Sequence, residues 1–310
     1  MTKRLLIIDC SKYSGGQIEY AKRISNTLRE NGFVVNLKQA RSLSEFKKII
    51  KDKKNHEQIV LNGLRSLYFY SVVRSLSSRV FYIQHTDWRD LQAGYLRLIL
   101  RIIFVHINLL VRDISIVAVH RLERKLFDPR SDIFLPCPLI RRENKKKNFN
   151  LPLRDCLFIG LLNNNKDPTY AIKECLGANK RLEVCGSGEL LTDISEFYQP
   201  EIELGNLVMS GWVDDTSRAL ISSDCLIVCS EYEAMPVVVL DALSLGIPVL
   251  IADHLRSIVD DPTLEKYVTR FPKVPGGLIS AFDRVVMPDQ EEFLLEWTMM
   301  VRVGVRKFES

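Results

Sequence analysis

Short runs of apolar residues alternate along this chain with longer segments of mixed, helix-like patterning. Continuous apolar runs are typical of strands buried on both faces of a parallel sheet, with helices between them. In the first half the predicted strands are 4–9, 33–38, 58–62, 80–84, 114–119 and 132–136. In the second half they are 155–160, 182–186, 207–210, 225–229, 248–252 and 267–271. The pattern predicts an α/β protein of two Rossmann-like, doubly wound domains that face a cleft, with the ligand at the carboxyl ends of the strands.

A polar, basic stretch between the two sets of strands marks the expected domain boundary. Residues 141–152 read RRENKKKNFNLP, which is linker composition. We expect an N-terminal domain over 1–145 and a C-terminal domain over 146–285. The tail 286–310 includes a segment that begins with acids and ends with bases, as the helix dipole favours, so we expect a terminal helix there.

The composition is that of a well-cored globular protein, with 46% hydrophobic and 26% charged residues among 310. The opening run 3–9 is too short for a secretory signal, and no apolar stretch reaches the roughly 20 residues of a membrane span. The seven cysteines form no CxxC motif and mostly sit in apolar runs. We therefore expect buried, reduced thiols in the cytoplasm, without disulfides, zinc or another metal site.

The net charge of +5 hides an asymmetry between the halves of the chain. Residues 1–145 hold 27 Lys and Arg against 13 Asp and Glu, a net charge of +14, and residues 146–310 carry −9. The segment 95–113 is almost entirely apolar with arginines inserted, so it is either a buried helix or an interfacial helix that contacts lipid. Lysine clusters at 47–54 and 141–147 add to the basic side. No nucleic-acid-binding motif is visible, and nucleic acid is the weaker explanation.

Two acids flank a proline in the stretch SEYEAMPVVVLDALSLGIPVL at 230–250. Pro236 suits the first turn of a helix, and the N–H groups of 237–239 would then offer a site for a diphosphate. Glu233 precedes that helix and Asp241 lies within it, where their carboxylates would accept hydrogen bonds from sugar hydroxyls. From the residues alone, an ordinary helix–strand packing unit with two solvated acids is equally open.

The same stretch closely resembles the E-x7-E signature of glycosyltransferase family 4, a retaining family with the GT-B fold. The resemblance implies that Glu233 approaches the donor hexose and that Asp241, in place of the usual Glu, binds the ribose. It also implies that the C-terminal helix packs back on the N-terminal domain and that no metal or other cofactor is needed.

Further landmarks match the family in order and spacing. Gly15 and Gly16 resemble its glycine-rich loop, although a plain strand-to-helix turn is the alternative. His85 ends a predicted strand where relatives often carry a histidine near the donor sugar, although a lone histidine at a strand end is more often structural. Lys166, in LFIGLLNNNKDP, fits the lysine that neutralises the diphosphate, whereas Leu161 replaces the expected arginine.

The resemblance assigns a set of residues to the site. Those assigned to catalysis are Glu233, Lys166 and His85, and those assigned to the donor are Gly15, Gly16, Gly160, Gly186, Gly188, Met235, Pro236, Val237 and Asp241.

We expect a glycosyltransferase that moves a sugar, with retention, from a nucleotide-diphosphate sugar to a saccharide or lipid-linked saccharide in cell-surface polysaccharide synthesis. The basic N-terminal domain suits peripheral contact with an anionic membrane at its cytoplasmic face. Two alternatives remain open: a sugar-nucleotide epimerase of the same fold, and a non-catalytic GT-B partner subunit. A nicotinamide-dependent oxidoreductase is disfavoured because no GxGxxG follows a first strand.

Overall fold

The chain forms two compact units. The computed structural model describes residues 3–11, 15–52, 58–73, 79–85, 104, 107, 114–119, 133–140, 155–233 and 235–308. Unit 1 comprises Met1–Pro138 together with Trp297–Ser310, and unit 2 comprises Leu139–Glu296. The predicted boundary at 145/146 lies outside the described residues.

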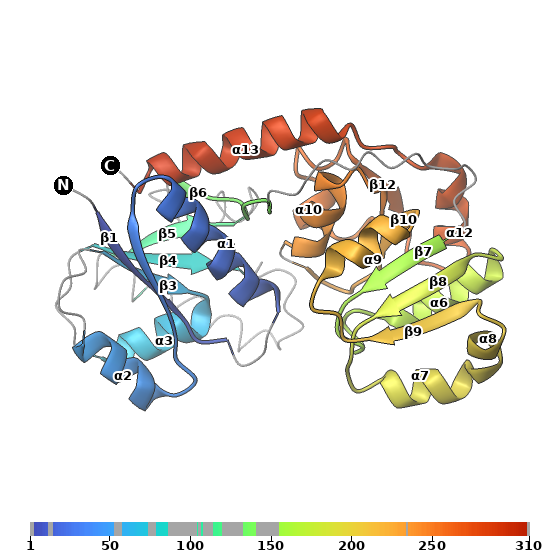
Figure 1. The fold of residues 1–310 in the computed structure, drawn as a ribbon, viewed down its shortest axis with the longest axis horizontal. Coiled ribbons are helices and arrows are strands. Elements are labelled where there is room, and N and C mark those ends of the chain that lie inside the picture. The colour runs from blue at the N-terminus through green and yellow to red at the C-terminus, as the bar shows by residue number, and fades with distance from the viewer. Residues whose placement is uncertain are drawn as a thin grey trace. The chain divides into compact units, whose positions relative to one another are not determined.

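Unit 1 is built on a six-stranded parallel sheet in the order β2-β1-β3-β4-β5-β6 (Figure 1). Its strands are β1 Arg4–Asp9, β2 Val34–Gln39, β3 Gln58–Asn62, β4 Val80–Gln84, β5 Ile114–Ala118 and β6 Ile133–Phe134. Its described helices are α1 Gly16–Glu30, α2 Leu43–Lys51 and α3 Leu64–Val72. The chain steps from β1 to β2 on one side and then returns past β1 to β3, so the winding reverses between β1 and β3.

Unit 2 contains a second six-stranded parallel sheet, in the order β12-β11-β10-β7-β8-β9. Its strands are β7 Asp155–Ile159, β8 Arg181–Cys185, β9 Leu207–Gly211, β10 Cys225–Val228, β11 Val249–Ala252 and β12 Val268–Phe271. The winding reverses between β7 and β10, which is the strand order of dinucleotide-binding folds.

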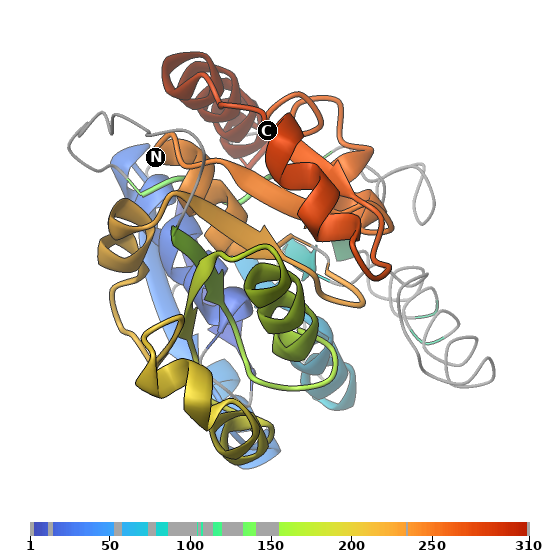
Figure 2. The ribbon, with the colours of Figure 1, turned by 90° about the vertical axis from the view of Figure 1, so that its right-hand side faces the viewer.

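Helices cover both faces of the second sheet. Helices α6 and α12 pack together on one face, and α9 and α10 pack together on the other (Figure 2). The helices that begin in this unit are α6 Pro168–Gly177, α7 Leu191–Phe197, α8 Gln199–Glu203, α9 Thr216–Ser222, α10 Val237–Ser244, α11 Arg256–Val259, α12 Gly277–Ala281, the 3₁₀ turn η2 Phe282–Arg284 and α13 Gln290–Arg306.

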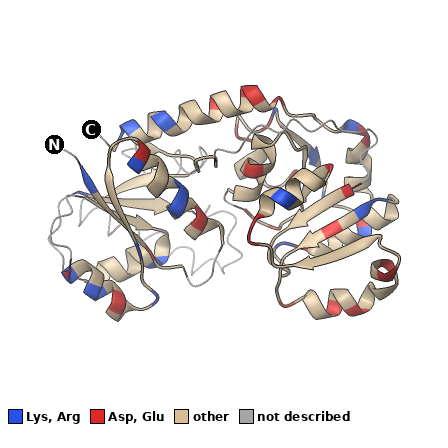
Figure 3. Cartoon of the chain, in the orientation of Figure 1, with Lys and Arg blue, Asp and Glu red and all other residues tan. Residues whose placement is uncertain are grey.

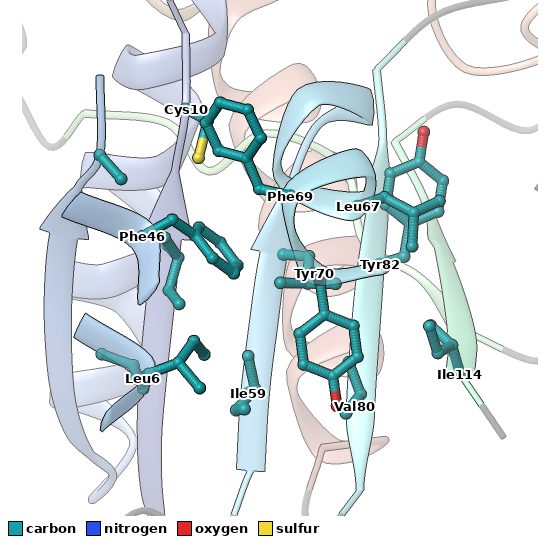
Figure 4. Packing of buried hydrophobic residues seen from close by; sticks show 14 of the residues in the cluster. Leu6, Cys10, Phe46, Ile59, Leu67, Phe69, Tyr70, Val80, Tyr82 and Ile114 are labelled. Carbon is teal, nitrogen blue, oxygen red and sulfur yellow. The ribbon is translucent and has the colours of Figure 1, made fainter. Parts of the chain in front are cut away.

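The cores are made by the apolar runs that predicted the strands. In unit 1, Leu6, Ile59 and Val80 project from neighbouring strands toward Phe46 of α2 and Tyr70 of α3 (Figure 4). Burial of one such side chain stabilises the fold by about 1.5–3 kcal/mol. The expected α/β class with two doubly wound parallel sheets is confirmed, although β6 is shorter than predicted because prolines at 136 and 138 stop the ladder.

Capping side chains hold α6 and α12 in place. Asp167 adopts a left-handed conformation, with φ 48°, and its Oδ1 accepts a hydrogen bond from the Tyr170 amide at 3.1 Å. The buried carboxylate of Glu174 accepts hydrogen bonds from the amides of Gly276 at 2.8 Å and Leu278 at 3.1 Å, at the start of α12. These bonds satisfy amides that have no partner within the helix, and they anchor the loop that follows β7.

Helix α13 belongs to both units by sequence. Its residues from Trp297 onward belong to unit 1, where Trp297 Nε1 donates to the Cys137 carbonyl at 2.8 Å. The ring of Phe308 packs on Phe81 of β4 with centroids 4.6 Å apart. The start of α13 lies in unit 2, where Lys266 forms ion pairs with Glu292 and Glu296.

All seven cysteines are buried and free, as the sequence predicts. Of the expected lysine cluster at 47–54, Lys47, Lys48 and Lys51 are exposed on α2 (Figure 3). The cluster at 141–147 lies outside the described residues. Within the described part of the chain, no helix combines the length and apolar character needed to cross a bilayer.

Candidate functional site

The winding of each sheet determines where a ligand can enter. Where neighbouring strands send their connections to opposite faces, a crevice opens at their carboxyl ends, and ligands of open α/β sheets bind there. In unit 2 this point lies between β7, which ends at Ile159, and β10, which ends at Val228. The loops after these two strands carry Lys166 and Glu233.

Lys166 and Glu233 meet at this point although they are 67 positions apart in sequence. The Nζ of Lys166 forms an ion pair with Oε1 of Glu233, and Ser230 Oγ donates to the same oxygen at 2.9 Å. Their side chains are 25% and 13% exposed, so the pair is shielded yet retains contact with solvent. The arrangement places one cation and one hydrogen-bond acceptor side by side.

Further polar groups hold the two loops together, and sequence reasoning missed them. Asn165 exchanges two hydrogen bonds with the backbone of Tyr232, at 3.2 and 3.3 Å. Ser257 Oγ donates to the Glu233 carbonyl at 2.7 Å, and His254 Nε2 donates to the Ser230 carbonyl at 2.9 Å. A single polar residue gives no local signal, so only the tertiary structure reveals that these residues lie beside the two loops.

Of three predicted glycines, Gly186 and Gly188 lie where loops approach closely. A Cβ at Gly186 would stand 1.8 Å from the Gly160 carbonyl oxygen, and one at Gly188 would stand 2.4 Å from the Leu162 carbonyl oxygen. A Cβ at Gly160 would lie 3.6 Å from Lys166 Cδ, which is an ordinary contact, so packing does not require glycine there. Gly186 and Gly188 therefore shape the Lys166 loop through packing, and the contact of all three glycines with a donor stays a prediction.

The helix start predicted at Pro236 is observed. Pro236 precedes α10 with extended backbone, and no side chain caps the helix there. The amide of Val239, expected to be available to a ligand, instead donates to the Pro236 carbonyl at 3.0 Å. The amides of Val237 and Val238 have no acceptor among the described residues. Two amides, rather than three, are thus available at this helix start.

The remaining predicted donor residues of unit 2 differ in exposure. Met235 lies half-buried beside the helix start, whereas Asp241 is only 4% exposed within α10. The free chain therefore presents little of the Asp241 carboxylate to solvent.

Leu161 is 42% exposed, immediately after Gly160. A second lysine nearby, Lys273, contacts Asp167 Oδ2 at 2.8 Å and also Glu231. Burial lowers the pKa of Lys273, but hydrogen bonds to the two carboxylates outweigh that effect and raise its pKa above the ordinary value. Because two carboxylates already surround this ammonium group, Lys273 brings no spare positive charge to replace the arginine expected at 161.

In unit 1, the winding reverses between β1 and β3, and polar side chains gather at their carboxyl ends. Gly15 and Gly16 are exposed at the start of α1, and a Cβ at Gly15 would meet no atom of the described residues within 4 Å. Their contact with a donor stays a prediction. His85 follows β4, the next strand along the sheet.

A buried polar network, which sequence reasoning missed, connects these strand ends. Asp9 is fully buried, and its Oδ1 accepts hydrogen bonds from Asn62 Nδ2 at 2.7 Å and from Gln17 Nε2 at 3.2 Å. Its Oδ2 accepts bonds from the amide and the hydroxyl of Ser11. Asn62 Oδ1 lies 2.6 Å from His85 Nε2. Such a set of bonds is what a buried carboxylate needs to remain in place.

Burial controls the charge of His85. Desolvation lowers the pKa of its imidazole to about 4, and the negative charge of Asp9 offsets only part of that effect. The ring also packs edge-on against Tyr20, with centroids 4.9 Å apart. At neutral pH the imidazole is therefore uncharged, and it can accept or donate a hydrogen bond but cannot neutralise a phosphate.

The structure describes only part of the residues that two predictions concern, that of an interfacial segment and that of no metal site. Within the expected interfacial segment 95–113, Phe104 packs against the core of unit 1 and Ile107 is 54% exposed, while most of the segment lies outside the described residues. No group of three or more metal-ligating side chains converges within the described ranges.

Part of the second unit is similar in sequence to known glycosyltransferases. Residues 154–285 match the family described as glycosyl transferases group 1. Over 85 residues the chain is 32% identical to the UDP-Gal:alpha-D-GlcNAc-diphosphoundecaprenol alpha-1,3-galactosyltransferase of Escherichia coli. That match covers 27% of this chain and 22% of the length of the relative.

Solved structures resemble this chain along nearly all of its length. The sucrose-phosphate synthase of Thermosynechococcus elongatus superimposes with a TM-score of 0.69 at 13% identity, over 98% of this chain and 94% of that one. Anabaena HepE bound to UDP gives 0.67 at 13% identity over 99% of both chains. The lipopolysaccharide outer core galactosyltransferase WaaB gives 0.64 at 12% identity, over 99% of this chain and 97% of that one. At these identities the likeness establishes the fold, which is that of glycosyltransferases with two Rossmann-like domains.

Proposed function

We propose that this chain, whose residues 154–285 match the glycosyl transferases group 1 family, transfers a sugar from a nucleotide-diphosphate sugar to a saccharide or lipid-linked saccharide. The sequence resemblance to that family is confirmed for the second unit. The activity, the donor and the acceptor are the proposal.

The observation that carries the proposal is the meeting of Lys166 and Glu233 at the switch point of the second sheet. A sugar diphosphate presents two kinds of group, anionic phosphate oxygens and neutral hydroxyls. An ammonium group and helix amides suit the first, and a carboxylate suits the second. Lys166, the start of α10 and Glu233 bring these groups together within one unit.

On this proposal Lys166 exchanges its partner when donor binds. Its ammonium group leaves Glu233 for the diphosphate, and the freed carboxylate accepts hydrogen bonds from the hexose. The bond between the sugar C1 and the diphosphate oxygen then breaks as the acceptor oxygen bonds to C1, and the acceptor proton leaves with the diphosphate. Lys166 and the amides of Val237 and Val238 stabilise the charge that develops on the leaving group. Transfer with retention, without a metal, follows the family resemblance.

The proposed donor is a UDP-sugar and the proposed acceptor is lipid-linked. Anabaena HepE binds UDP and UDP-glucose, and the Escherichia coli relative is a UDP-Gal-dependent galactosyltransferase with a diphosphoundecaprenol-linked acceptor. Exposed lysines on α2 and the net charge of residues 1–145 support peripheral contact with an anionic membrane at its cytoplasmic face.

A thermal-shift screen with UDP, UDP-glucose, UDP-galactose and other nucleotide sugars tests the proposal, because a ligand that binds the folded state raises the Tm. Lys166→Met should weaken UDP binding by roughly 10- to 100-fold, as loss of a charge-assisted hydrogen bond does. Glu233→Gln should bind UDP at least as tightly as the wild type, because Lys166 loses its competing carboxylate, while sugar transfer falls by about 100-fold or more.

The exposed pair of Lys266 and Glu296 supplies matched controls in the same unit. Lys266→Met and Glu296→Gln remove the same charges away from the switch point and should leave UDP binding unchanged. If no nucleotide raises the Tm, the proposal is wrong. A stable complex with a second protein would then support the hypothesis of a non-catalytic partner subunit. Donor consumption without an acceptor, yielding an altered nucleotide sugar, would identify an epimerase.

A further inference from the structure

A chain of hydrogen bonds at the carboxyl end of the first sheet fixes the position of the His85 ring. Asp9, Asn62 and His85 follow β1, β3 and β4, which are neighbours in the sheet. They form a chain of hydrogen bonds of 2.7 Å and 2.6 Å that ends on the imidazole. Both Asp9 and Asn62 are fully buried.

The orientation of the Asn62 amide is determined by its other partners. Its Nδ2 lies 2.7 Å from the Asp9 carboxylate and 3.1 Å from the Gln17 carbonyl oxygen. Both partners only accept hydrogen bonds, so Nδ2 must face them and Oδ1 must face His85. The amide oxygen is therefore the atom 2.6 Å from Nε2.

An acceptor in this place decides which ring nitrogen carries the proton. A hydrogen bond to Asn62 Oδ1 requires a proton on Nε2 of His85. Because burial lowers the pKa of this imidazole to about 4, the ring carries one proton at neutral pH. Nδ1 then has an unprotonated lone pair, and it has no partner among the described residues.

We propose that Asn62, oriented by Asp9, is a positioning residue that holds His85 as the neutral tautomer protonated on Nε2. The ring then offers a ligand only an acceptor, Nδ1. Such a group binds a hydroxyl and does not bind a phosphate oxygen, so the ligand group that His85 suits is the hydroxyl of a sugar. This last step rests on the proposed function, whereas the tautomer does not.

Nitrogen NMR of the full chain labelled with 15N-histidine tests the tautomer directly. The chain has five histidines, and the signals of His85 are identified by their loss in His85→Gln. At pH 7 we expect a protonated Nε2 and an unprotonated Nδ1. A proton on Nδ1, or a charged imidazolium, would overturn the proposal without any reference to activity.

Variants at position 62 test the role of the amide. Asn62→Leu removes the acceptor at similar volume, so we expect a mixture of tautomers and a fall in kcat of about tenfold, as loss of one positioning hydrogen bond entails. The Kd for UDP should not change. Gln17→Met is the matched control, since it removes hydrogen bonds to Asp9 and to the Asn62 backbone without touching His85. A single Nε2 tautomer in Asn62→Leu would contradict the proposal, and the wild-type spectrum decides the matter if that variant does not fold.

A ligand titration separates this inference from the proposed function. A UDP-sugar that raises the Tm should move the Nδ1 signal of His85, whereas UDP alone should not. If the UDP-sugar binds and Nδ1 does not respond, the contact to the sugar is wrong while the proposed function stands. If no nucleotide sugar binds, the proposed function fails, and the tautomer is still decided by the spectrum of the free protein.

Discussion

Single side chains decide the chemistry of both clusters, through charge and burial. The opposite charges of Lys166 and Glu233 neutralise one another when no ligand is bound, so a diphosphate must compete with a carboxylate for the ammonium group. Asp9 is buried, and Ser11, Gln17 and Asn62 all donate hydrogen bonds to its carboxylate, which allows a charge to persist inside the unit. His85, beside it, is neutral because burial outweighs the attraction of that carboxylate. The ion pair of unit 2 therefore suits an anionic group, and the neutral imidazole of unit 1 suits a hydroxyl.

The burial of His85 predicts an acid sensitivity of the fold. The ordinary pKa of the imidazole is 6.5 and that in the folded chain is about 4, so protonation favours the unfolded state. This contribution to stability is fully present above pH 6.5 and is lost as the pH falls toward 4. Among described residues, Asp9 of β1, Tyr20 of α1 and Asn62 of β3 face the ring.

Urea unfolding of wild type and His85→Gln between pH 7.5 and pH 4 measures this contribution. The wild type should lose roughly 1–2 kcal/mol more than the variant over that range, after allowance for the partial exposure of the ring. Parallel pH dependence of the two proteins would contradict this explanation.

At the level of elements, the loops after β7 and β8 are shaped by each other. The Leu162 amide donates to the Ser187 carbonyl at 2.9 Å, and the Leu190 amide donates to the Leu162 carbonyl at 3.0 Å. These bonds bring the backbones so close that Gly188 has no room for a side chain. The loop that carries Lys166 is thus held from the side by its neighbour.

Gly188→Ala should therefore disturb both stability and ligand binding. Its Cβ would stand 2.4 Å from the Leu162 carbonyl oxygen, and the backbone must shift. We expect a loss of about 1–3 kcal/mol in unfolding free energy and weaker UDP binding. Gly177→Ala is the control, because its Cβ would meet only Ile279 Cδ1 at 3.5 Å, an ordinary contact. Equal effects of the two substitutions, by thermal unfolding, would show that the close approach is unimportant.

Across the whole molecule, the chain leaves unit 1 at Pro138 and returns to it at Trp297. The returning half of α13 buries Trp297, Val301 and Val305 in unit 1, and Phe308 is buried just after the helix ends. A Cβ at Gly304 would stand 2.5 Å from the Phe134 carbonyl oxygen, so the helix lies directly against the end of β6. Unit 1 is therefore completed by the last residues of the chain.

Loss of the Trp297 side chain should destabilise unit 1 strongly. The residue is fully buried and its indole donates a hydrogen bond to Cys137. Trp297→Ala should lower the unfolding free energy by about 3–5 kcal/mol, and Trp297→Phe by about 1–2 kcal/mol. Met299→Ala on the same helix is the control, because that side chain is 52% exposed and should change stability by less than about 0.5 kcal/mol. A similar Tm for all three variants would mean that unit 1 is stable without this helix.

Much of the fold could be predicted because local sequence patterns indicate where strands, helix starts and turns lie. The apolar runs at β1, β7 and β10 are largely buried, and such runs between helix-length segments are typical of strands in covered parallel sheets. Pro236 and the glycines at 186 and 188 likewise mark a helix start and close turns. The residues around the site carry no such mark. They are single polar residues with no pattern around them, namely Asn62 in β3, Gln17 in α1, Asn165 in a loop and Ser257 in α11.

The sequence by itself therefore determined the elements, their parallel arrangement and two of the residues at the second switch point, Lys166 and Glu233. Only the tertiary structure decided that these two form an ion pair, that Asp9 and Asn62 stand behind His85, and that the Val239 amide is occupied. The reason is physical: local patterns encode which face of an element is buried, whereas strand order and register decide which distant side chains meet. Charge pairing and the protonation of a buried ring depend on those meetings, which no local pattern contains.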